Sequence, residues 1–120
     1  MAAPAVLQSY AAGEWVAGSD RRIITSAITG EAIFEAGSDG LSFSQMVDYA
    51  RETGGPTLRK MTFHERAAIL KALAQYLNQR REDLYALSYH TGATKPDSMI
   101  DIDGGISTLF VYASKGRREL

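Results

Sequence analysis

The residues of this chain that could do chemistry include two histidines, His64 and His90. They lie on different predicted helices, with no carboxylate or cysteine at metal-ligand spacing, so we interpret both as structural or solvated. The 120 residues contain no cysteine, which excludes a thiolate nucleophile, a thiolate metal site and a disulfide among them. We therefore predict no metal site in this chain.

An aspartate pair and one lysine are the next candidates. Asp101 and Asp103 are two residues apart, and such positions do not face each other on a helix, so we do not expect a shared acid–base pair. We interpret Asp101 as a charge that helps a helix start, and Asp103 as a hydrogen-bond or ion-pair partner. Lys95 follows Gly92-Ala93-Thr94, which lacks the Gly-Lys-Ser/Thr order of a phosphate loop. We therefore predict no catalytic and no cofactor-binding residue within this chain.

The double glycine Gly104-Gly105 is the most unusual local feature. It lies inside a predicted helix that starts near Asp97 or Ser98 and ends around Gly116. Two glycines in a helix interior cost roughly 1 kcal/mol each relative to alanine. Such a cost indicates that the absence of side chains serves a purpose here, either close packing of another backbone or open space for a ligand. The residues alone leave both alternatives open.

Composition and charge limit the classes of partner. The net charge is -1, which argues against nucleic acid or an anionic membrane surface as the main partner. No apolar run approaches the roughly 20 residues of a transmembrane helix. The segment Met1-Ala2-Ala3-Pro4 has neither a basic nor an apolar region of a secretory signal. We expect a protein of the cytoplasm that binds neither nucleic acid nor membrane.

Two regions must position these residues. Residues 1–37 form a β-hairpin region, in which we expect three or four short strands with turns at Gly13 and Gly30. The expected strands are Val6 to Tyr10, Glu14 to Val16, Ile23 to Thr25 and Glu31 to Glu35.

Residues 42–116 predict four helices. The first follows Ser42 and stops at Gly54-Gly55-Pro56, and the second begins with a capping box from Thr62 to Glu65. The third spans about Arg80 to His90, and the fourth carries the double glycine. The chain is thus α+β, and its strands lack a sheet partner of sufficient length, which indicates the opening of a larger α/β protein.

Several of these segments together resemble the aldehyde dehydrogenase superfamily. They are Gly13-Glu14-Trp15-Val16, Ile28-Thr29-Gly30-Glu31, Glu65-Arg66-Ala67 with Leu70, Leu73 and Leu77, and Thr91-Gly92-Ala93-Thr94-Lys95. The family has an Asn-Pro pair before the Thr-Gly-Glu, where this chain has Ser26-Ala27. The resemblance implies an α/β parent fold whose catalytic cysteine, glutamate and asparagine and cofactor-binding glycines lie beyond Leu120. By itself the 120-residue chain is then expected to be inactive.

A second set of segments resembles one group within this superfamily, the bifunctional ring-opening enzymes of bacterial phenylacetate degradation. The segments are 61–68, 91–94, Asp97-Ser98, 101–106 and 108–114. The resemblance implies a homo-oligomeric parent that oxidises a CoA-thioester semialdehyde with NADP, or alternatively NAD. It also implies a C-terminal hydratase domain that opens oxepin-CoA.

Two alternatives to the phenylacetate group remain. One is the semialdehyde dehydrogenase of the aerobic benzoyl-CoA pathway, which shares the run from Asp101 to Gly105. The other is a non-enzymatic helical module that buries an apolar face by self-association.

The family resemblance also gives the double glycine a use. In the family, the helix that follows the Gly-Lys-Pro-like turn lines the mouth of the substrate tunnel. Ile100 and Gly104 stand where simpler relatives present bulky apolar side chains to a small aldehyde. We therefore expect Gly104, together with Gly105, to widen the tunnel for a long acyl-CoA chain, with Ile100 as a further lining residue.

Overall fold

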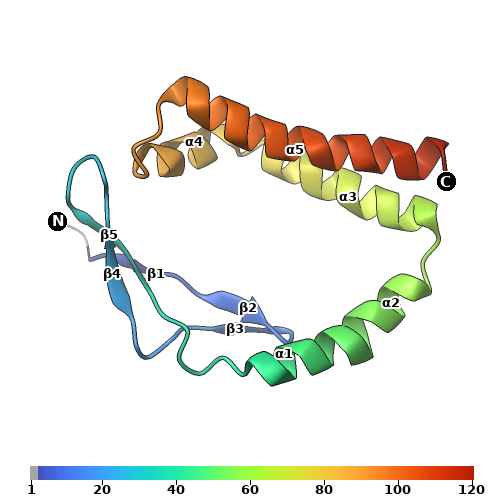
Figure 1. Cartoon of the computed structure of the whole chain (residues 1–120), viewed down its shortest axis with the longest axis horizontal. Coiled ribbons are helices and arrows are strands. Elements are labelled where there is room, and N and C mark those ends of the chain that lie inside the picture. Colours follow the sequence, from blue (N-terminus) through green and yellow to red (C-terminus); the bar gives the residue numbers. More distant parts are fainter. Residues whose placement is uncertain (1–2) are drawn as a thin grey trace. The chain divides into compact units, whose positions relative to one another are not determined.

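The computed structural model describes residues 3–120, and it divides into two compact units. The first unit extends to Thr57 and holds the strands, and the second runs from Leu58 to Leu120 and holds the long helices (Figure 1). The α+β composition predicted from the sequence is confirmed. Each unit is described by itself below.

Five short strands make up the β part of the first unit. They are β1 Ala5–Val6, β2 Ser9–Ala11, β3 Glu14–Val16, β4 Arg22–Thr25 and β5 Ala32–Ala36. Strand β5 pairs antiparallel with β4 and parallel with β1, while β2 and β3 form a separate antiparallel hairpin. The prediction of a single strand from Val6 to Tyr10 is wrong, because this segment changes partner and contributes to both sheets.

The turns between the strands fall where glycine was expected. Gly13 and Gly30 have φ angles of 84° and 74°, in the left-handed region that favours glycine. The second turn is held by the buried Ser26, whose Oγ accepts hydrogen bonds from the backbone N–H groups of Ile28 and Thr29, both at 3.2 Å. An asparagine side chain can accept in the same way, so serine preserves the turn at the position where the resemblance expects asparagine.

The helix after Ser42 continues further than predicted. Helix α1, Phe43–Tyr49, passes into a π-helical turn at Ala50–Gly54 and then into α2, Gly55–Arg59. The predicted stop at Gly54-Gly55-Pro56 is therefore wrong. Pro56 follows directly on the π-helical turn, which is closed by the Gly55 N–H donating to the Ala50 carbonyl.

The second unit contains α3, Phe63–Asn78, α4, Arg81–Tyr89, and α5, Lys95–Arg118. Helix α5 begins earlier than predicted, because Thr94 is its N-cap and accepts a hydrogen bond from the Asp97 N–H at 3.3 Å. Pro96 then lies in the first turn, where proline is tolerated. The role given to Asp101 is accordingly wrong: Asp97, and not Asp101, is the acidic residue in the first turn.

Small residues let α3 and α5 approach each other closely. Ala67 and Ala74 of α3 are buried, and so are Ala113 and Gly116 of α5. A Cβ atom on Gly116 would lie 3.0 Å from the Cβ of Ala67, so only glycine fits there without a shift. Large apolar side chains remain exposed on the same helices, among them Ile69 and Leu73 of α3.

The capping box at the start of α3 is confirmed. The Thr62 hydroxyl accepts from the Glu65 N–H at 3.2 Å, and the Glu65 carboxylate accepts from the Thr62 N–H at 2.7 Å. We expect Thr62→Ala to lower the free energy of unfolding by about 1 kcal/mol, the usual cost of losing an N-cap. Urea unfolding followed by circular dichroism measures this. An unchanged midpoint would show that α3 does not depend on its cap.

The same box predicts a pH dependence. Its backbone and side-chain hydrogen bonds to Thr62 hold the pKa of Glu65 below the usual 4.5. The stabilisation is therefore complete above the unfolded pKa and is lost as pH falls through the lower folded pKa. Glu65→Gln keeps an acceptor but cannot titrate. We expect thermal unfolding scans at falling pH to show a steeper loss of stability for the wild-type chain than for Glu65→Gln. Parallel losses of stability in the two proteins would contradict this.

Candidate functional site

The three tunnel candidates lie on one exposed stretch of α5. Ile100 is 75% exposed, and Gly104 and Gly105 are exposed as well. A Cβ atom on either glycine would meet no other atom of residues 3–120 within 4 Å, apart from its own helix backbone and chain neighbours. Within residues 3–120, no other helix packs against these glycines. Open space next to them is what the structure shows.

Ile100 and Gly104 share a face of α5, because residues four apart lie one above the other on a helix. The buried residues of α5, which include Ser98, Ile106 and Ala113, lie on its other side. Val111, seven residues after Gly104, continues the outward face and is 50% exposed. The face formed by Ile100, Gly104 and Val111, called the outer face of α5 below, thus points away from α3.

Three contacts with α4 fix the rotation of this part of α5. The Tyr85 hydroxyl donates to Asp103 Oδ1 at 2.5 Å, and Arg81 Nη1 lies 4.0 Å from Asp103 Oδ2. The buried Ser98 donates from its Oγ to Ser88 Oγ at 2.8 Å. Because Ser98 and Asp103 are held by α4, the outer face between them is kept turned away from the helical core.

The interpretation of Asp103 as a hydrogen-bond and ion-pair partner is confirmed. Its carboxylate raises the pKa of Tyr85, first because the neutral phenol donates the hydrogen bond and further because of its negative charge. No sequence pattern indicates this pair, because Tyr85 is 18 positions before Asp103 and only the folding of α4 against α5 brings them together.

The two histidines are not brought together. His64 is in the first turn of α3, while His90 follows α4 and makes an edge contact with the Tyr89 ring at 5.5 Å. Within residues 3–120, no group of three or more histidine, cysteine, aspartate or glutamate residues could hold a metal ion. In the same part of the chain, no helix is both long enough and apolar enough to cross a membrane.

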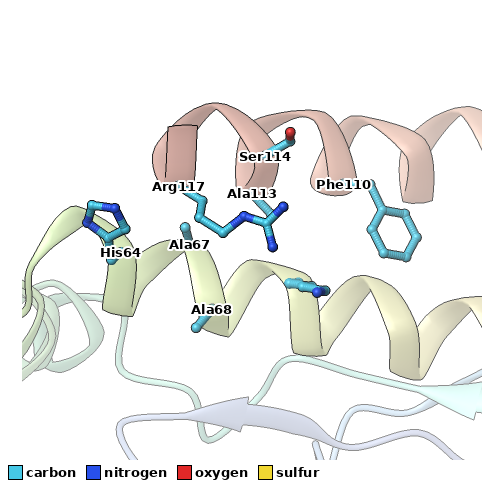
Figure 2. A pocket seen from close by; sticks show the side chains of 8 residues that line it. His64, Ala67, Ala68, Phe110, Ala113, Ser114 and Arg117 are labelled. Atoms are coloured by element: carbon cyan, nitrogen blue, oxygen red, sulfur yellow. The ribbon is translucent and has the colours of Figure 1, made fainter. Parts of the chain in front are cut away.

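A groove between α3 and α5 was not predicted from the sequence. It has a volume of about 360 Å³, and Figure 2 shows the Arg117 side chain reaching from α5 into the space between the two helices. The lining residues are His64, Ala67, Ala68, Lys71, Phe110, Ala113, Ser114 and Arg117. The available signal was helical spacing, since His64 and Lys71 on α3 and Phe110 and Arg117 on α5 are each seven apart and share a face.

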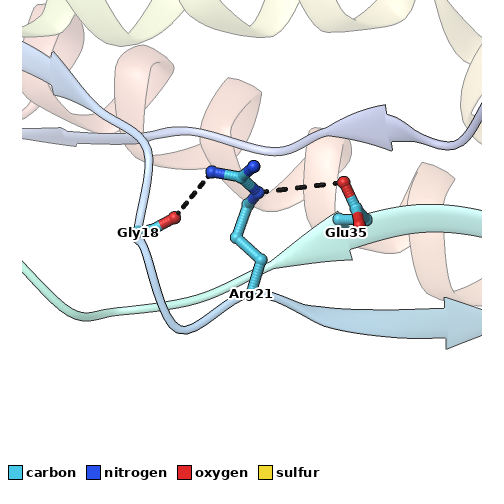
Figure 3. Close-up of polar contacts among 3 residues, drawn as sticks. All are labelled: Gly18, Arg21 and Glu35. Carbon is cyan, nitrogen blue, oxygen red and sulfur yellow. Dashed lines mark hydrogen bonds and ion pairs between the residues drawn. The ribbon is translucent and has the colours of Figure 1, made fainter.

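The first unit has a charged corner whose groups are satisfied within the unit. Figure 3 shows Arg21 between Gly18 and Glu35: its Nη1 donates to the Gly18 carbonyl at 3.0 Å and its Nε lies 3.8 Å from Glu35 Oε2. The Asp20 carboxylate accepts from the Asp39 N–H at 2.9 Å, which is the main reason that its pKa is lowered. These contacts hold the corner of the first unit together.

Comparison with known proteins places these features in context. The aldehyde dehydrogenase family matches residues 15–120 of the chain. A curated relative, the 3,4-dehydroadipyl-CoA semialdehyde dehydrogenase of Aromatoleum evansii, is 36% identical over 113 residues. The alignment covers 92% of this chain and 22% of the relative, so the chain spans about a fifth of that protein's length.

Proposed function

This chain belongs to the aldehyde dehydrogenase family, and we propose that it is the N-terminal part of an enzyme that oxidises a CoA-linked semialdehyde to the corresponding acid. Aldehyde oxidation transfers a hydride to a nicotinamide cofactor, and water supplies the second oxygen of the acid. NADP, with NAD as the alternative, would accept that hydride. With no cysteine in the chain, the cysteine that the family uses as nucleophile must come from elsewhere in the parent enzyme.

The outer face of α5 carries the proposal. Gly104 and Gly105 leave open space where a side chain would stand, and Ile100 provides an exposed apolar contact beside it. A long acyl chain needs width and an apolar wall, and the Tyr85–Asp103 and Ser88–Ser98 contacts keep this face available. We therefore assign Ile100, Gly104 and Gly105 to the mouth of the substrate tunnel.

Two parent enzymes fit this assignment. The first is the bifunctional enzyme of phenylacetate degradation, with its additional hydratase domain. The second is a semialdehyde dehydrogenase without that domain, and it is favoured by the name of the Aromatoleum evansii relative, which states a dehydrogenase activity alone. In both, residues 1–37 and 42–116 belong to one dehydrogenase domain of a cytoplasmic homo-oligomer. Membership in the family argues against a helical module of unrelated origin.

Turnover by the complete protein that contains this chain tests the function. The assays use 3,4-dehydroadipyl-CoA semialdehyde and a short free aldehyde, each with NADP and with NAD. We expect kcat/KM to be clearly higher for the CoA semialdehyde, and equal values would contradict the proposed substrate class. Hydration of oxepin-CoA by the same protein separates the two parents. The 120-residue chain alone should show no turnover, and measurable NADP reduction by it would contradict the placement of the nucleophile.

A further inference from the structure

The groove between α3 and α5 gathers positive charge without a neutralising partner. Lys71 and Arg117 line it, and none of its eight lining residues is acidic. The ion pairs within residues 3–120 are Arg21–Glu35, Arg81–Asp103 and Lys115–Glu119, so none of them involves a groove residue. Like charges that share a groove repel each other, and an anion between them offsets that repulsion.

A second groove on the same pair of helices has a different charge balance. Its lining includes Phe63, Arg66, Lys115 and Glu119. Arg66 donates to the Met61 carbonyl at 3.1 and 3.3 Å and lies 4.9 Å from the Phe63 ring centre, and Lys115 pairs with Glu119 at 3.5 Å. The protein itself thus provides partners for the cations of the second groove. For Lys71 and Arg117 in the first groove, residues 3–120 provide no such partner.

We propose that the first groove binds the phosphate-bearing nucleotide end of the CoA group, an inference that rests on the proposed function. Arg117 and Lys71 provide N–H donors and positive charge for phosphate oxygens. Phe110 and Ala113 form an apolar wall against which the adenine ring can lie. The volume of about 360 Å³ lies within the range of small-molecule sites.

The position of the groove along α5 agrees with this ligand. One groove residue, Ser114, lies on nearly the same face of α5 as Ser107 and Ile100, because the three are spaced seven residues apart. Gly104 lies beside this line. Arg117 and Gly104 are separated by about 20 Å along the helix axis, at the α-helical rise of about 1.5 Å per residue. An extended thioester arm could therefore run from the groove to the open glycines.

Calorimetry with CoA on the complete protein tests the groove. Lys71→Ala and Arg117→Ala each remove one proposed phosphate contact, and we expect each to raise the Kd for CoA by about tenfold. Lys115→Ala is the matched control, because it removes a lysine from the second groove, and it should change the Kd by less than about twofold. NADP and inorganic phosphate are titrated in the same way. Circular dichroism and thermal unfolding of all three variants should match the wild type, which confirms that they are folded.

The remaining outcomes of these titrations separate the groove assignment from the proposed function. An unchanged Kd for CoA in both groove variants, or an equal loss in Lys115→Ala, would overturn the groove assignment. A loss of NADP binding as large as the loss of CoA binding would make the site one for the phosphate of the cofactor, which also contradicts the proposal. If the groove variants weaken CoA binding but the wild type does not oxidise the semialdehyde, the proposed function fails and the groove stands. If CoA binding is unaffected while the wild type prefers the CoA substrate, the function stands and the groove fails.

Discussion

Gly104→Leu in the complete protein is expected to raise the KM for the CoA semialdehyde by about tenfold or more, with little change for a short free aldehyde. The open space at Gly104 would be filled by an isobutyl group on the same face as Ile100. A long acyl chain that must pass this point loses room, whereas a short aldehyde does not extend so far. Steady-state kinetics with both substrates measure the difference.

Gly104→Ala is the control for this substitution. The added Cβ atom meets nothing within 4 Å in residues 3–120, and alanine is the better helix former, so we expect a gain of about 0.5–1 kcal/mol in the free energy of unfolding. The kinetics of this variant should stay near those of the wild type. Equal KM increases for both aldehydes in Gly104→Leu would indicate misfolding, and no increase for either would remove Gly104 from the tunnel.

Gly116→Leu is expected to cost about 2–3 kcal/mol in the free energy of unfolding. Its Cβ atom alone would lie 3.0 Å from the Cβ of Ala67 and 3.6 Å from the Phe63 carbonyl oxygen. Neither neighbour can move away as a flexible side chain can, because one is attached directly to the α3 backbone and the other belongs to it. The larger side chain must therefore push α3 and α5 apart along the seam that buries Ala67 and Ala113.

Chemical denaturation of wild type and variant measures this cost. A midpoint for Gly116→Leu close to that of the wild type would show that the α3–α5 seam is loose enough to accept a large side chain. Comparison with Gly104→Ala on the same helix separates the two kinds of glycine. Gly116 is required because α3 approaches it closely, whereas Gly104 leaves space that no part of residues 3–120 fills.

Local signals in the sequence located most elements of the fold. The capping box at Thr62 and the turns at Gly13 and Gly30 were predicted correctly, because each depends on contacts within a few residues. The errors at Pro56 and Pro96 both come from taking a proline as a helix boundary. Pro96 lies in the first turn of α5, where its missing N–H would have no helical partner in any case. Pro56 follows directly on the π-helical turn of one continuous helical segment, and no local sequence signal indicated that turn.

Local sequence segments also indicated the aldehyde dehydrogenase family, and the family match over residues 15–120 confirms it. The finer substrate assignment, the cofactor and the oligomer stay predictions. Ser26 shows why a departure from the family pattern need not change the fold: its hydroxyl supplies the two acceptor contacts that the turn requires.

The sequence by itself determined the family, the division into an N-terminal strand region and a C-terminal helical region, and the existence of a costly double glycine, because these follow from residue types at short spacing. Only the tertiary structure decided which glycine is packed and which is open, since that depends on where α3 lies relative to α5. It also brought Tyr85 to Asp103 and placed Lys71 beside the same groove as Arg117. Such pairs join residues that are distant along the chain, and no local pattern specifies them.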